Sequence, residues 1–192
     1  MLRLVRMRAG FVLVACASFL GASDAFKIES GEPFVLVHGE TYLGAIVPEG
    51  RDSSKLRFLQ ISSSGYWTPT PESVAKLEDK LKSALERGQQ KPEMLVQPGK
   101  HSAKELAYVA GEIGSVLENL PSFRRQYVGL IMKDGTRRIL VNAFPGAEKE
   151  RERFPYWRQG IVWVDDGGFW YWRIQYDLET GTFSHFDSNG YG

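Results

Sequence analysis

The chain has 192 residues, 43% of them hydrophobic, and its 24 lysines and arginines nearly balance its 23 aspartates and glutamates. This apolar content is sufficient for a folded core and excludes a chain that is disordered throughout. The near-neutral charge argues against a nucleic-acid-binding protein, because that class usually carries a basic excess that meets the phosphates. The single cysteine, Cys16, leaves the rest of the chain without an internal disulfide, a thiol nucleophile or a cysteine-based zinc site.

Residues 1–25 have the pattern of a bacterial secretory signal peptide. Three arginines and no acidic residue occupy positions 1–9, an apolar run follows over 10–20, and small residues lead to Ala25. Signal peptides have these three parts in this order, and the apolar run is too short to cross a bilayer. We therefore expect an exported protein, periplasmic or secreted, that is cleaved after Ala25 and then has no transmembrane anchor.

A second way of processing the N-terminus is open. The stretch Leu13-Val14-Ala15-Cys16 resembles a bacterial lipobox, in which Cys16 would carry a lipid anchor and become the first residue. The apolar run continues beyond Cys16, whereas the tether of a lipoprotein is usually polar. The pattern therefore favours cleavage after Ala25, with lipidation at Cys16 as the alternative.

Strands are predicted at the start of the mature domain. Apolar runs over 34–37 and 41–47 flank a glycine-containing turn at 38–40 and predict two strands. A third strand is predicted over 55–62, where the apolar residues alternate at first.

Two helices follow. Thr70 and Pro71 mark the start of the first, because threonine can accept a backbone N–H at the N-cap and proline suits the first helical position. The apolar residues after them share one face of a helix that ends near Gly88, and they are Val74, Leu77, Leu81, Ala84 and Leu85. A second helix begins after Ser102, which forms a capping box with Glu105, and a proline ends it.

The C-terminal half is predicted to be β structure. Strands over 125–132 and 137–144 flank Asp134-Gly135, which is a strong hairpin signal. A charged loop follows, and three further strands then predict an antiparallel meander over 161–164, 169–176 and 182–186.

Runs of strands separated by a helical block predict an α+β fold rather than alternating βαβ units. We expect one domain over residues 26–192, with an antiparallel sheet of consecutive hairpins packed on one or two helices. A cystatin or NTF2-like roll is one arrangement of this pattern.

No catalytic or cofactor-binding motif stands out. The three histidines, His38, His101 and His185, have no second histidine or cysteine at ligand spacing. Ser64 lacks the Gly-x-Ser-x-Gly elbow of hydrolases, and glycine-rich phosphate loops are absent. We expect no catalytic residue, no metal site and no cofactor, with a hydrolase built from dispersed Ser, His and Asp residues as an alternative.

The C-terminal part carries a series of turn motifs. Asp165-Asp166 before two glycines predicts a turn rather than a pair of catalytic carboxylates. The stretches VDDGG at 164–168, YDLETGTF at 176–183 and NG at 189–190 together resemble the tail of a family of small exported bacterial proteins of uncharacterised function. The likeness covers roughly residues 120–192. The resemblance implies a single exported domain, and it transfers no catalytic residue to this chain.

Aromatic residues are dense near the C-terminus, where they could form a binding surface. In a strand over 169–176, alternation places Tyr171 and Arg173 on the face opposite the core. This pair is the predicted contact patch, and Trp157 and Trp163 are further candidate binding residues, since aromatic side chains dominate binding hot spots. The other face suits the core and carries Trp170, Trp172 and Ile174.

These patterns predict an exported, non-catalytic binding or accessory protein of the cell envelope. Its ligand or protein partner is an unidentified component of the envelope, and nucleic acid is not expected. An envelope hydrolase is one alternative, and an inhibitor or immunity protein for a secreted enzyme is another.

Overall fold

The computed structural model describes residues 27–29, 34–51, 56, 59, 62–148 and 151–191. The predicted signal peptide, the cleavage after Ala25 and the alternative at Cys16 lie outside these residues. In the part of the chain that is described, no helix is both long and apolar enough to cross a membrane.

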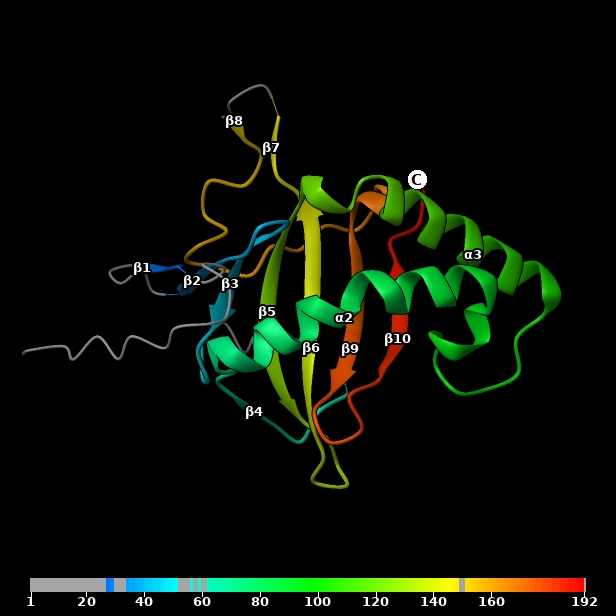
Figure 1. The fold of residues 1–192 in the computed structure, drawn as a ribbon, viewed down its shortest axis with the longest axis horizontal. Coiled ribbons are helices and arrows are strands. Elements are labelled where there is room, and N and C mark those ends of the chain that lie inside the picture. Colours follow the sequence, from blue (N-terminus) through cyan, green and yellow to red (C-terminus); the bar gives the residue numbers. More distant parts are fainter. Residues whose placement is uncertain are drawn as a thin grey trace, which may run out of the picture.

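An eight-stranded sheet forms the centre of the domain, and the α+β class predicted from the sequence is confirmed (Figure 1). The strands run in the order β1-β2-β3-β5-β6-β9-β10, with β4 placed beside β5. Strands β1 and β10 form the two edges, so the sheet is open. The strand bounds are β1 (Lys27–Glu29), β2 (Val35–His38), β3 (Leu43–Val47), β4 (Gly65–Trp67), β5 (Phe123–Ile131), β6 (Arg137–Pro145), β9 (Trp172–Asp177) and β10 (Phe183–Ser188).

The predicted hairpins at both ends of the chain are confirmed. Strands β2 and β3 pair antiparallel, and β5 and β6 pair antiparallel around the Asp134-Gly135 turn, where Gly135 has a φ of 85°. Strands β9 and β10 continue the antiparallel series from β6. A short separate hairpin, β7 (Ala147–Glu148) with β8 (Arg151–Glu152), stands beyond β6.

One parallel pair interrupts the series of hairpins that the sequence predicted. Strands β3 and β5 pair in parallel, with Ala45 opposite Gln126. Parallel neighbours need a long crossover connection, and the segment that contains β4 and both helices supplies it. The second half of β5, from Gly129 to Ile131, pairs with β4 instead.

Both helices lie on one face of the sheet (Figure 1). Helix α2 (Pro71–Gln90) begins at Thr70, whose side chain accepts a hydrogen bond from the backbone N–H of Ser73. Helix α3 (Ala103–Glu118) begins at Ser102 with the predicted capping box. Single 3-10 turns follow the helices and precede β9, and they are η2 (Pro92–Met94), η3 (Leu120–Ser122) and η4 (Gly168–Trp170).

The helix face of the sheet carries the larger of two apolar clusters. The predicted stripe of α2 is buried against residues of β6 and β9 such as Ile139, Trp172 and Ile174. The full burial of one such side chain stabilises the fold by about 1.5–3 kcal/mol. Packing of this face therefore fixes α2 across the strands.

A buried ion pair also fixes α2 on the sheet. Glu78 of α2 accepts hydrogen bonds from Arg125 Nη1 at 2.9 Å and from the Tyr127 hydroxyl at 2.7 Å, and both partners lie on β5. Burial raises the pKa of Glu78, while the Arg125 guanidinium and the Tyr127 hydroxyl act against this rise. Because an unpaired buried charge is costly, the pair selects one position of α2 over β5.

Among the described residues, the opposite face of the sheet is covered without a helix of comparable length. The segment between β8 and β9 runs behind the sheet and buries Trp157, Ile161 and Val162 against β2, β3, β5 and β6. Residues 161–164 are irregular, so the strand predicted there is wrong. The predicted strand over 169–176 begins only at Trp172, because the preceding residues form the turn η4.

Two buried side-chain amides hold this segment by hydrogen bonds to its backbone. These bonds replace the backbone pairing that a strand would have. Gln126 Nε2 donates to the carbonyls of Trp157 at 2.7 Å and Gly160 at 2.8 Å, and its Oε1 accepts from the backbone N–H of Val162 at 3.0 Å. Asn142 Nδ2 donates to the Val162 carbonyl at 2.9 Å. The backbone of the segment is therefore satisfied by side chains of β5 and β6.

The strand predicted over 55–62 lies mostly outside the described residues. The two that are described, Leu56 and Leu59, are helical rather than extended, and both are buried on the same face as Trp157. At these positions the predicted strand is wrong. The apolar spacing of three residues suits one side of a helical turn.

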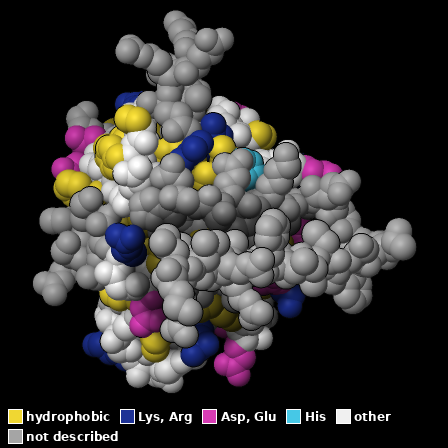
Figure 2. Space-filling view, turned by 90° about the vertical axis from the view of Figure 1, so that its left-hand side faces the viewer, with side chains coloured by type: hydrophobic (Ala, Val, Ile, Leu, Met, Phe, Trp, Pro, Cys, Tyr) yellow, Lys and Arg dark blue, Asp and Glu magenta, His cyan; other side chains and the backbone are white. Residues whose placement is uncertain are grey.

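The described surface reflects the balanced charge of the chain. Seen from the side of β1, β2 and β3, basic, acidic and hydrophobic side chains are interspersed (Figure 2). The described side chains visible from this side therefore form no continuous patch of one charge.

Replacement of Gln126 by leucine tests the role of the amide. The variant leaves two buried carbonyls and one buried N–H without their partner, and each such group costs about 1–3 kcal/mol. We expect the free energy of unfolding, measured by urea denaturation, to fall by about 3 kcal/mol or more. The exposed Gln89 near the end of α2 gives the control, Gln89→Leu, for which little change is expected. Equal stability of the two variants would show that the amide is dispensable.

Candidate functional site

A cleft of about 810 Å³ lies at the free edge of β10. Ligand sites of proteins commonly have volumes of about 300–1,000 Å³. Its walls come from five parts of the chain: Leu59, the connector between the two helices, the start of α3, Leu140 of β6, and the strands β9 and β10. We call it the edge cleft.

The topology explains why the sheet is hollowed here. On the face away from the helices, the described apolar cover packs on β2, β3, β5 and β6 and includes no residue of β9 or β10. Strand β10 is the last of the described strands, and none of these pairs with its outer side. The connector touches this edge where the backbone N–H of Phe186 donates to the Leu95 carbonyl at 2.7 Å.

Strand β9 supplies a polar wall. Arg173 and Gln175 lie on the uncovered face, opposite Asn142 and Leu140 of β6. The Arg173 guanidinium lies 2.5 Å from Asp187 Oδ2, and this carboxylate is largely exposed. The guanidinium is thus held in place at the mouth of the cleft.

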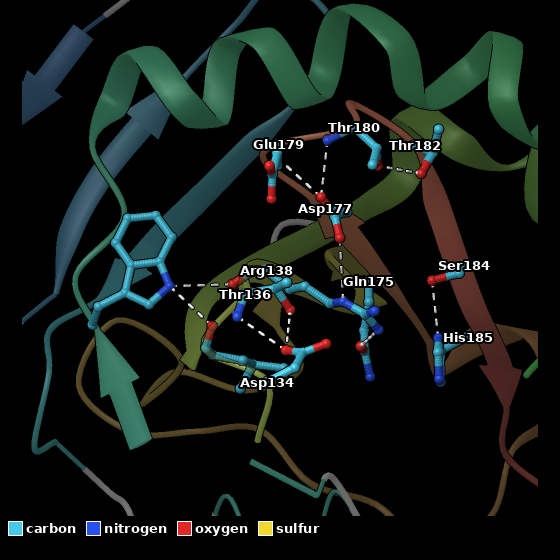
Figure 3. A network of polar contacts seen from close by, with 12 residues as sticks. Asp134, Thr136, Arg138, Gln175, Asp177, Glu179, Thr180, Thr182, Ser184 and His185 are labelled. Atoms are coloured by element: carbon cyan, nitrogen blue, oxygen red, sulfur yellow. Dashed lines mark hydrogen bonds and ion pairs between the residues drawn. The ribbon is translucent and has the colours of Figure 1, made fainter. Parts of the chain in front are cut away.

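A network of side chains extends from Gln175 of this wall to residues outside the cleft (Figure 3). Gln175 Oε1 accepts from Arg138 Nη1 at 3.2 Å, and Arg138 Nε lies 3.6 Å from Asp177 Oδ2. On the neighbouring strand β10, the imidazole of His185 lies beside the Ser184 hydroxyl, with 2.9 Å between Nδ1 and Oγ. Cations, carboxylates and an imidazole therefore share one face of three adjacent strands.

His185 occupies an unusual backbone conformation. Its φ is 57°, the only positive value at a described non-glycine residue, and it lies where the β9–β10 register shifts between Ser184 and Asp187. Histidine is among the residues that tolerate this left-handed region better than most. Burial lowers the pKa of His185, and the positive charge of Arg138 lowers it further. Both effects favour the neutral imidazole.

The opposite wall is the start of α3. The capping box holds Ser102 and Glu105 together, with 2.7 Å between the Ser102 backbone nitrogen and Glu105 Oε2, and these hydrogen bonds lower the pKa of Glu105. His101 Nε2 lies 2.8 Å from the Gln97 carbonyl oxygen. Tyr108, one turn further along the helix, is 49% exposed and gives the cleft an accessible aromatic ring.

Of the four candidate binding residues predicted from the sequence, only Arg173 lines the edge cleft. Tyr171 is 7% exposed and Trp157 is 1% exposed, so the prediction that Tyr171 belongs to an exposed patch is wrong. The reason is the cover on this face, where the Phe154 ring lies 6.1 Å from the Tyr171 ring. Trp163 is 37% exposed but lies outside the cleft.

The predicted core face of the aromatic segment is confirmed in part. Trp172 and Ile174 are buried under the helices. Trp170 is 37% exposed, because it belongs to η4 and not to the strand. Its ring lies against Phe169, with 4.8 Å between the centroids.

Two histidines that are far apart in the sequence line the same cleft. His101 of the connector and His185 of β10 both face it, a convergence that their spacing did not indicate. His38 lies at the end of β2, and the Ser64 hydroxyl donates to the Ile131 carbonyl at 3.0 Å, away from the cleft. Among the described residues, no group of three or more His, Cys, Asp or Glu side chains could hold a metal ion.

The Asp165-Asp166 stretch forms the predicted turn, with positive φ at Gly167 and Gly168. The N–H groups of these glycines donate to the Gly190 carbonyl at 3.0 and 3.1 Å. The turn therefore anchors the C-terminal segment beside the start of β9.

Comparison with models of protein families, with curated proteins and with solved structures finds no match for this chain. The resemblance of residues 120–192 to a family of small exported bacterial proteins stays a prediction. The residues of the cleft are therefore interpreted from their geometry alone.

Replacement of His185 by glycine tests whether the histidine serves the fold. Glycine adopts positive φ without the cost of about 1–2 kcal/mol that a side chain meets there. We expect the free energy of unfolding to stay unchanged or to rise by up to about 1 kcal/mol. This result in chemical denaturation would indicate that the imidazole is kept for a role other than stability. A loss of more than 1 kcal/mol would instead assign it a structural role.

Proposed function

We propose that this chain is an exported, non-catalytic binding protein of the bacterial cell envelope, and that its ligand occupies the edge cleft. The signal-peptide pattern of residues 1–25 and the resemblance of residues 120–192 to exported proteins motivate the location. The cleft, rather than the aromatic sheet, is the binding surface that the arrangement of side chains supports best.

A short peptide is the ligand class that suits the cleft. The decisive observation is that both signs of charge face one hollow, with Lys104 and Arg173 beside Glu105 and Asp187. A peptide carries an ammonium, a carboxylate and backbone groups that need hydrogen-bond partners, and such partners line this site. The exposed ring of Tyr108 adds an apolar contact of the kind that anchors peptides.

The position beside an edge strand supports the same ligand class. Edge strands carry backbone groups on their outer side that can pair with an extended segment. At the middle of β10, Leu95 already takes the N–H of Phe186, and the register shift at His185 interrupts the ladder. Recognition is therefore expected to depend on side chains of the cleft more than on the addition of a full strand.

A thermal-shift titration of the full chain tests the proposal. The panel holds short zwitterionic peptides, a cell-wall fragment with a peptide stem, glycans without peptide, and divalent metals. A ligand at 100 times its Kd stabilises the protein by about 2.7 kcal/mol and should raise the unfolding midpoint by roughly 5–10 °C. Tyr108→Ala and Arg173→Gln should each weaken peptide binding by about tenfold, as truncation of a hot-spot side chain does.

Matched control variants are available outside the cleft. Tyr156 and Arg137 are also exposed, so Tyr156→Ala and Arg137→Gln should bind peptide with the affinity of the unchanged protein. A rise in the unfolding midpoint with free peptides and with the cell-wall fragment supports the proposal. The ligand that gives the larger rise identifies where the bound peptide comes from. A shift only with glycans or metals, no shift, or equal loss in control and cleft variants would contradict it.

An envelope hydrolase is the second candidate, and one contact favours it. The Ser184 hydroxyl lies 2.9 Å from the Nδ1 of His185, whose lowered pKa favours the neutral imidazole and whose side chain lines the cleft. A neutral imidazole can take the proton of a serine hydroxyl as the oxygen attacks a carbonyl carbon, and can give that proton to the alcohol or amine that leaves as the ester or amide bond breaks. Water then releases the acyl group from the serine. On this hypothesis, Ser184→Ala and His185→Gln abolish turnover of ester or amide substrates while the unfolding midpoint holds. Turnover that survives both substitutions, or no turnover in the unchanged protein, would exclude this pair.

A further inference from the structure

A second, smaller pocket lies on the helix side of the same edge. Its volume is about 360 Å³, and its walls are the second half of α2, the turn between β9 and β10, and η2 with Leu95. This is about twelve times the volume of one water in the liquid, which is ~30 Å³. We call it the helix pocket, and it is separate from the edge cleft, with which it shares no lining residue.

The helix pocket has an apolar floor and a basic rim. Ala84, Leu95 and Phe183 are buried and supply the floor. The charged residues of the lining are Lys80 and Arg87, and no carboxylate lines the pocket. A cavity of this kind complements a molecule with an apolar body and a negative group.

Neither cation is neutralised by an acidic partner among the described residues. Lys80 Nζ contacts the Tyr176 hydroxyl at 3.4 Å and lies 5.8 Å from the centre of that ring. The ion pairs of the described residues include neither Lys80 nor Arg87, and the neighbouring Glu86 pairs with Lys82 instead. The positive charge at the rim therefore remains available to a ligand.

Two glycines shape this pocket. A Cβ at Gly88 would lie 2.1 Å from the Leu95 side chain, so only glycine lets Leu95 pack against α2 and close the floor. Gly181 has a φ of 66°, and a Cβ there would lie 2.8 Å from Lys80 Nζ. The turn thus passes close to the lysine because it has no side chain at this position.

We propose that the helix pocket binds a small amphiphilic carboxylate, such as a free short-chain acid or the apolar C-terminal residue of a peptide. The apolar body lies on Ala84, Leu95 and Phe183, and the carboxylate lies between Lys80 and Arg87. Arginine and lysine suit this anion because charge-assisted hydrogen bonds to a carboxylate are stronger than neutral ones. This site is independent of the peptide cleft proposed above.

Calorimetric titration of the full chain with octanoate, N-acetyl-leucine and the neutral octanamide tests the proposal. We expect one of the two carboxylates to bind at least tenfold more tightly than the amide, and the better one identifies the source of the ligand. The difference should shrink at high salt because ions screen charges at an exposed rim. If neither acid binds more tightly than octanamide, the pocket is an apolar cavity without anion recognition and the proposal is overturned. Failure of both acids to bind would also overturn it.

Substitutions assign the binding to this pocket. Lys80→Gln with Arg87→Gln should weaken carboxylate binding at least tenfold, whereas the matched pair Lys76→Gln with Lys82→Gln, exposed on the same helix, should not. Arg87→Gln alone tests the proposal if the double variant is unstable, because Arg87 is exposed. Unchanged affinity in the Lys80 and Arg87 variants would overturn the assignment. The peptide titration of the edge cleft is run on the same variants, so that failure at one site is distinguished from failure at the other.

Discussion

The structure on the face of the sheet opposite the helices depends on the hydrogen bonds of the Gln126 amide. An irregular segment cannot satisfy its own backbone groups when it is buried, yet residues 153–164 cover an apolar face that neither α2 nor α3 reaches. Gln126 supplies three of the missing partners and Asn142 supplies another. Because both side chains project from the central strands β5 and β6, the position of the cover is tied to the register of the sheet. Trp157 and Val162 can then be buried without a regular ladder.

The same constraint determines where the cover ends. On β9, the residues beside Asn142 and Leu140 are Arg173 and Gln175, which contact charged and amide side chains instead of the backbone of the segment. The apolar cover consequently stops at β6 and leaves the face of β9 and β10 hollow. The edge cleft thus depends on two sets of polar side chains. Gln126 and Asn142 of β5 and β6 bind the covering segment, whereas Arg173 and Gln175 of β9 do not.

Local chemistry made the helices and tight turns predictable from the sequence. Thr70, Ser102 and Asp134-Gly135 act on backbone groups within a few residues of themselves, so their effect can be predicted without knowledge of the fold. The burial of Tyr171 and the proximity of His101 to His185 depend on residues distant in the sequence. Alternation placed Tyr171 on the correct side of the sheet, but only the path of Phe154 decides that this side is covered. The parallel pairing of β3 with β5 escaped prediction for the same reason, since apolar runs do not reveal which strand a crossover returns to.

The edge of β10 shows how one short connector can serve two sites. An unpaired edge strand invites association with other chains, and two features reduce this risk here: the register shift at His185 and the hydrogen bond from Phe186 to Leu95. That bond also separates the two hollows, because Leu95 lines the helix pocket and its neighbour Val96 lines the edge cleft. The connector therefore contributes neighbouring residues to both hollows. The positive φ of His185 occurs at the same register shift between β9 and β10. This irregularity protects the edge of β10, and the imidazole of His185 lines the cleft.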